Sequence, residues 1–169
     1  MPTINGEVCV INGKPVDKVY SNGKQVYGRN LWAISKVVSG WLWSDSGLQN
    51  PTSAPDAMIP NPFTIPVGEK SLVMTTYNPN KVVNTVSSYR VTFFNGSTFI
   101  GPKMAIQLTG EAVQTNKWDI PTEATKVYLS AVLAPVGVNV HGPSIRIKYE
   151  FGDQATPWTP APEDLGITD

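Results

Sequence analysis

Short runs of alternating hydrophobic and polar residues recur along the chain. Four runs, at residues 72–77, 89–94, 127–133 and 145–150, repeat with a period of two, so that alternate side chains share a face. In each run one face is apolar and the other is mixed, which is typical of antiparallel strands that cover a core on one side. Fifteen prolines and fourteen glycines divide the chain into pieces too short for typical helices. The pattern therefore predicts an all-β fold, a two-sheet antiparallel β-sandwich with no helix longer than about three turns.

The first thirty residues differ in sequence pattern from the rest of the chain, because the dipeptide Asn-Gly occurs in them three times. The three pairs are Asn5-Gly6, Asn12-Gly13 and Asn22-Gly23. Asn-Gly is the strongest short hairpin signal, since both residues accept positive φ in a type I′ turn. We expect residues 1–30 to form a small N-terminal β-hairpin segment. Two-stranded ribbons are marginal alone, so this attachment segment must pack on the main domain or on another protein, unless it simply extends the main sandwich.

The main sandwich is expected over residues 31–164, and residues 165–169 are expected to be a frayed tail or linker. A loop-rich stretch with five prolines lies between Trp43 and Pro66. Trp41 and Trp43 are two residues apart and share a face, which makes them either a core wedge or a stacking platform. Cys9 lies in an apolar run and is expected to be a buried small hydrophobe rather than a reactive thiol.

The amino-acid composition limits the kinds of binding partner to expect. The chain has 169 residues and a formal net charge of zero, with no basic cluster, which argues against a nucleic-acid partner. Only 15% of its residues are charged, so the surface must be covered by neutral polar groups. Such a surface suits neutral polar ligands or wide contacts with other subunits. No stretch approaches the ~18 apolar residues of a membrane helix, and the opening residues MPTINGEV lack the features of a signal peptide.

Candidate catalytic residues are few. The single histidine, His141, lies in a turn-like Val-His-Gly-Pro setting and has no spaced partner for a metal site. No pair of carboxylates stands out as the two that a glycosidase requires, and glycine-rich phosphate loops are absent. The sequence therefore predicts a protein that is not an enzyme and that has no cofactor and no metal site.

Residues suited to saccharide binding are more numerous. Aromatic rings stack on the C–H face of a pyranose, while planar polar groups such as the arginine guanidinium hydrogen-bond its hydroxyls. The predicted carbohydrate-binding residues lie on the mixed faces of their strands, with the tryptophan at the rim: Tyr77, Arg90, Phe94, Trp118 and Tyr128. The alternative is that this face is buried, because both sheets of a sandwich bury one side.

Five stretches, in order, resemble the β-sandwich modules appended to tail proteins of phages that infect Gram-positive bacteria. The most specific is the closing string Trp-Thr-Pro-Ala-Pro-Glu-Asp at residues 158–164. The chain departs from the module pattern at residues 149–152, where Tyr-Glu-Phe-Gly replaces the usual Leu-Glu-Lys-Gly. The five stretches are Val16–Leu31, Pro62–Lys70, Tyr89–Ile100, Ile120–Leu129 and Ile147–Asp164.

The resemblance implies a jelly-roll-like sandwich and a place in the virion, on a tail tip, a baseplate or another decoration. A protein of this kind is made in the host cytoplasm. It implies a weak, multivalent adhesion module whose partners are a host cell-wall saccharide, other virion proteins and further copies of the chain. The alternative is a purely structural virion protein without a ligand.

The residues of the closing motif also predict its conformation without reference to the resemblance. Gly152 permits a sharp exit from the last strand, and three prolines hold the following segment extended. We expect Trp158 to fold back as an apolar plug under the end of the sandwich, with ligand stacking as the alternative.

Overall fold

A computed structural model describes most of the chain, namely residues 7–39, 42–44, 47–49, 56–59, 61–81, 83–132 and 145–168. Four features of interest in the sequence lie outside the part that is described. They are Asn5-Gly6, Trp41, the side chain of Trp43, and His141.

Two antiparallel sheets dominate the described residues. The first has three strands in the order β13 (Val113–Asp119), β10 (Ser71–Tyr77) and β15 (Arg146–Phe151). The second has the order β12 (Thr98–Thr109), β11 (Val83–Asn95), β14 (Lys126–Val132), β8 (Asp56–Met58) and β5 (Val38–Ser39), with β9 (Phe63–Thr64) also paired with β14. The predicted all-β fold is confirmed. The described pairings do not define a jelly roll, so that connectivity stays a prediction.

Three two-stranded hairpins and two short 3-10 turns complete the described elements. The helical turns are η1 (Ile34–Lys36) and η2 (Pro162–Leu165). Within the described part of the chain, no helix is long and apolar enough to span a membrane. The hairpins pair β1 (Val10–Ile11) with β2 (Lys14–Pro15), β3 (Lys18–Ser21) with β4 (Lys24–Gly28), and β6 (Leu42–Ser44) with β7 (Gly47–Gln49).

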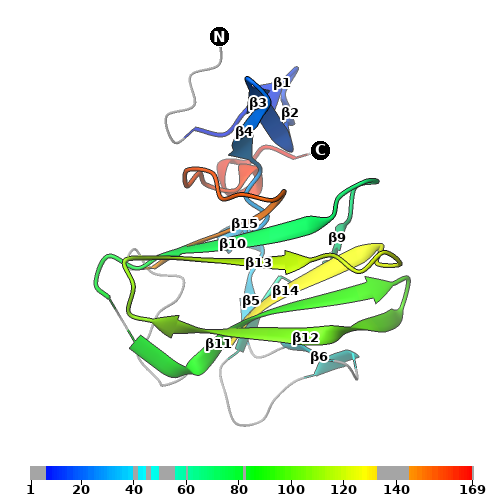
Figure 1. Ribbon diagram of the computed structural model, residues 1–169, viewed down its shortest axis with the longest axis vertical. Helices are drawn as coiled ribbons and strands as arrows, with labels where there is room; N and C mark the ends of the chain where they lie inside the picture. The colour runs from blue at the N-terminus through cyan, green and yellow to red at the C-terminus, as the bar shows by residue number, and fades with distance from the viewer. Residues whose placement is uncertain are drawn as a thin grey trace.

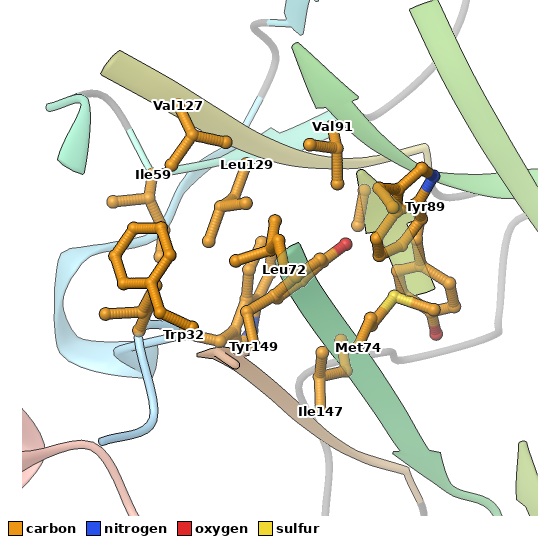
Figure 2. Packing of buried hydrophobic residues seen from close by; sticks show 14 of the residues in the cluster. Trp32, Ile59, Leu72, Met74, Tyr89, Val91, Val127, Leu129, Ile147 and Tyr149 are labelled. Carbon is orange, nitrogen blue, oxygen red and sulfur yellow. The ribbon is translucent and has the colours of Figure 1, made fainter. Parts of the chain in front are cut away.

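The two larger sheets face each other and bury one hydrophobic core between them (Figure 1). Figure 2 shows its side chains pointing toward one another from both layers. Each fully buried aliphatic or aromatic side chain stabilises the fold by about 1.5–3 kcal/mol, so this core is the main source of stability. Ten of its members fall at the apolar positions of the alternating runs: Leu72 and Met74 on β10, Ile147 and Tyr149 on β15, Tyr89, Val91 and Phe93 on β11, and Val127, Leu129 and Ala131 on β14.

The two described Asn-Gly pairs form the predicted turns. Asn12 and Gly13 have φ of 52° and 79°, and Asn22 and Gly23 have φ of 51° and 75°. Two successive positive values are the signature of a type I′ turn. Ile11 pairs with Lys14 and Ser21 with Lys24, so both loops contain two residues.

The N-terminal hairpins lie on the outer side of the three-stranded sheet, beside the C-terminal segment (Figure 1). Strands β1 to β4 pair only with one another among the described residues, so they do not extend the sandwich. Hairpin β3–β4 docks on its own chain, because Lys18 forms an ion pair with Glu69 and Gln25 Nε2 donates to the Phe151 carbonyl at 3.3 Å. Packing on the main domain is therefore observed for this hairpin, and docking of the segment on another protein stays a prediction.

The predicted frayed tail is wrong for residues 165–167. Leu165 is the last residue of η2. The next two backbone N–H groups close that turn, since Gly166 N donates to Glu163 O at 3.2 Å and Ile167 N donates to Pro162 O at 3.0 Å. These bonds satisfy carbonyls that a helical turn otherwise leaves free at its end.

Three of the six tyrosines, Tyr27, Tyr89 and Tyr149, are buried at 1% exposure or less. Burial raises the pKa of Tyr27 to about 12 and that of the other two well above the ordinary value. A raised pKa in the folded state adds stability that is complete below about pH 10, where unfolded tyrosines begin to ionise. That stability is lost as pH rises further.

We therefore expect the free energy of unfolding to fall above about pH 10. Phenolate absorbance from these three side chains should appear only together with unfolding in a pH titration. Tyr20→Phe is the control, because Tyr20 is 58% exposed and its loss should leave the alkaline midpoint unchanged. Titration of Tyr27, Tyr89 and Tyr149 near pH 10 in the folded protein would contradict this account.

Candidate functional site

Three of the five predicted site residues share one surface. Arg90 and Phe94 lie on β11 and Tyr128 on β14, all on the face of the six-stranded sheet that points away from the core. Phe94 and Tyr128 meet edge to face, with ring centroids 5.0 Å apart and planes at 74°. Phe94 is only 5% exposed. The rings therefore pack on each other and do not form an open platform.

This surface is also partly covered. Strand β6 lies against β14, and Figure 1 shows it on the outer side of the six-stranded sheet. Thr92 and Ser130, which point the same way as Arg90 and Tyr128, are 0% and 1% exposed. The sequence pattern identified the face correctly, but it did not indicate that another segment lies over it.

Trp118 is a core residue, and its predicted place at the rim of a site is wrong. It is 3% exposed and belongs to the core cluster. It pairs with Leu72 across β13 and β10, and its ring stacks on Tyr149 with centroids 6.3 Å apart. The polar neighbours that suggested exposure lie beside it on an amphipathic strand, where adjacent side chains point to opposite faces.

Tyr77 lies on the other sheet, so the prediction that all five residues form one site is wrong. It is the last residue of β10 and pairs with Arg146, the first residue of β15. Leu72, Met74 and Ile147 face the core, so by alternation Tyr77 and Arg146 face outward from the three-stranded sheet.

Trp158 stands beside these two residues and is not a buried plug. It is half-buried, and the Arg146 Cζ atom lies 4.7 Å from the centroid of its ring. A cavity of about 390 Å³ opens here, lined by Tyr77, Pro79, Ala112, Arg146 and Trp158. We call it the aromatic groove. The sequence placed Arg146 on a mixed face and offered ligand stacking as the alternative for Trp158, but nothing in it joined the two.

The polar groups of the aromatic groove are hydrogen-bond donors at neutral pH. Burial, and next the Glu150 carboxylate, raise the pKa of Tyr77, so its hydroxyl stays protonated. That hydroxyl donates to the Thr156 carbonyl at 3.4 Å. The Arg146 guanidinium has five N–H donors and is always charged. Its stack on the indole is worth about 0.5–1 kcal/mol at an exposed site, which helps to hold both planar groups in place.

A buried ion pair fixes the segment that carries Trp158. Lys148 and Glu150 are both 0% exposed, although they lie on the outward face of β15, and their Nζ and Oε2 atoms are 3.5 Å apart. Thr156 connects them, since its hydroxyl accepts from Lys148 Nζ at 2.7 Å and donates to Glu150 Oε2 at 2.6 Å. Lys148 Nζ also donates to the Pro157 carbonyl at 2.8 Å, directly before Trp158.

Gly28 admits this arrangement because it has no side chain. Its backbone N–H donates to Thr156 Oγ1 at 3.1 Å. A Cβ atom at this position would lie 2.0 Å from Glu150 Oε2, far inside van der Waals contact. The close approach of β4 to β15 therefore requires glycine.

The end of the first stretch, at residues 29–30, is bonded to the closing motif at residues 158–164. Asn30 Nδ2 donates to the Thr159 carbonyl at 3.0 Å and to the Ile147 carbonyl at 3.1 Å. Arg29 forms an ion pair with Glu163 at 2.5 Å. These contacts have a structural role, because they join the end of the N-terminal segment to the closing motif.

Comparison with protein-family models and with curated proteins finds no match to this chain. Among the described residues, no three histidine, cysteine, aspartate or glutamate side chains converge to hold a metal ion. Cys9 is 8% exposed, as expected for a small hydrophobe, and burial raises the pKa of its thiol.

Proposed function

We propose that the protein is a virion adhesion module, carried on a phage tail or baseplate, which binds host cell-wall saccharide weakly and in many copies. It acts as a binding module and not as an enzyme. Two features support the proposal: the resemblance of residues 16–164 to the β-sandwich modules of phage tail proteins, and the aromatic groove. The groove is the observation that carries it.

The aromatic groove has the chemistry that a saccharide requires. Trp158 and Tyr77 offer ring surface for the C–H face of a pyranose, and Arg146 offers a planar fork of donors for hydroxyl oxygens. The groove is open and buries little of a ligand, so we expect a Kd of roughly 10⁻⁴ M, about −5 to −6 kcal/mol. Many copies on one particle convert such weak binding into useful avidity.

The Trp158→Ala variant tests this proposal. We expect saturable binding of host cell-wall polysaccharide to be lost, while the free energy of unfolding falls by only about 1–2 kcal/mol, less than for a fully buried aromatic. Titration by NMR and urea unfolding measure the two effects.

Tyr128→Ala is the matched control, because Tyr128 is also a half-buried aromatic but lies on the other sheet. It should retain binding. Loss of binding in Tyr128→Ala with retention in Trp158→Ala would place the site on the face predicted from the sequence. No binding to the wild-type protein at millimolar sugar would leave the structural virion protein as the better proposal.

A further inference from the structure

A second and larger groove lies at the other end of the three-stranded sheet, between that sheet and hairpin β3–β4. It has a volume of about 720 Å³. We call it the lysine groove. Its charged lining residues are four lysines and two acids: Lys18, Lys24, Lys70, Lys117, Glu69 and Asp153.

The lysine groove has an excess of positive charge on a protein with no net charge. Lys18 is neutralised by its ion pair with Glu69, and both side chains are largely buried. The other three lysines are exposed, and no ion pair joins them to an acid in the part of the chain that the structure describes. Only Asp153 opposes their three ammonium groups within the lining.

The groove also offers an aromatic surface. Tyr20, on β3, is 58% exposed and is one of the lining residues. Gln154 adds a side-chain amide, which both donates and accepts hydrogen bonds. An exposed ring and several ammonium groups in one groove suit a ligand that has sugar faces and negative charges together, because lysine acts as a point charge for phosphate and carboxylate.

We infer that the lysine groove is a second binding site, and that its ligand is a saccharide carrying phosphate or carboxylate groups. The inference rests on the proposed function in that the ligand is a glycan, but it uses different residues. Ser71 lines the lysine groove and Tyr77 lines the aromatic groove. These residues are the two ends of β10, roughly 20 Å apart at 3.3 Å per residue. An extended polymer would have to span about this distance to occupy both grooves.

The test replaces the three unpaired lysines together, as Lys24→Gln, Lys70→Gln and Lys117→Gln. All three side chains are exposed, so the fold should be unaffected. The matched control is Lys14→Gln, Lys36→Gln and Lys81→Gln, which makes the same change in net charge at exposed lysines outside the groove. The probes are mannopentaose phosphate, unphosphorylated mannopentaose and a hyaluronan tetrasaccharide, titrated by NMR.

We expect the groove variant to bind the phosphorylated sugar or the uronate sugar about tenfold more weakly than wild type, since each exposed ion contact contributes modestly. The control variant should bind as wild type does. Binding of the charged sugar should weaken with added salt. The preferred charged probe distinguishes phosphate from carboxylate as the natural group.

The outcomes separate this inference from the proposed function. The lysine groove is not a binding site if wild type and groove variant bind the charged probes equally. The same conclusion follows if neither charged probe binds at millimolar concentration. Tighter binding of a single-stranded oligonucleotide than of either sugar overturns the ligand class. Retention of charged-sugar binding in Trp158→Ala supports the lysine groove even if the aromatic groove fails. If Trp158→Ala loses binding of the neutral sugar and the lysine-groove variant keeps it, the result supports the aromatic groove and gives no support to the lysine groove.

Discussion

Replacing Glu150 with alanine is expected to lower the free energy of unfolding by about 3–5 kcal/mol, because it leaves the Lys148 ammonium buried without its counter-charge. Glu150 is 0% exposed, and its two carboxylate oxygens accept from the Thr156 N–H and hydroxyl at 2.8 and 2.6 Å. The variant therefore loses an ion pair and also releases the segment that leads to Trp158. Urea unfolding measures the change.

A double variant, Lys148→Met with Glu150→Leu, is the control for this prediction. Replacing both charges with apolar groups of similar size removes the unpaired charge and should cost far less than the single change. A loss below about 1 kcal/mol in Glu150→Ala would contradict the account. It would mean that water reaches the pair and that the hydrogen bonds between Glu150 and Thr156 contribute little to stability.

Replacing Trp118 with alanine is expected to destabilise the protein by about 3–5 kcal/mol, as for other buried tryptophans. The ring is 3% exposed and stacks on Tyr149 in the centre of the core, so its loss leaves a cavity that the two sheets close only in part. Thermal or urea unfolding measures this effect.

Saccharide binding by the fraction of Trp118→Ala that remains folded should be unchanged. This distinguishes Trp118 from Trp158, whose replacement should affect binding more than stability. A stable Trp118→Ala protein that no longer binds saccharide would restore the site predicted from the sequence.

The core and the turns were predictable from the sequence. Alternation with a period of two identified which side chains of β10, β11, β14 and β15 face inward, because only one choice of face buries an apolar set. The Asn-Gly pairs predicted two-residue hairpins for a similarly local reason, since few other residues accept positive φ at both positions.

The site was less predictable, because periodicity shows which residues share a face but not what lies over that face. Lys148 and Glu150 alternate with core residues and were assigned to a mixed face, yet the C-terminal segment covers them completely. Trp118 looked exposed because its sequence neighbours are polar. Trp158 and Arg146 come together only through long-range packing of the closing motif on β15, which no local pattern encodes.

The most direct test of the central claim is an NMR titration of the wild-type protein with host cell-wall polysaccharide, observed at the indole N–H signals of its five tryptophans. The account predicts a saturable shift of the Trp158 signal at about millimolar sugar, with the Trp118 signal unmoved because that ring is in the core. A shift confined to other tryptophans, or none at saturating sugar, would contradict a saccharide site formed by Tyr77, Arg146 and Trp158.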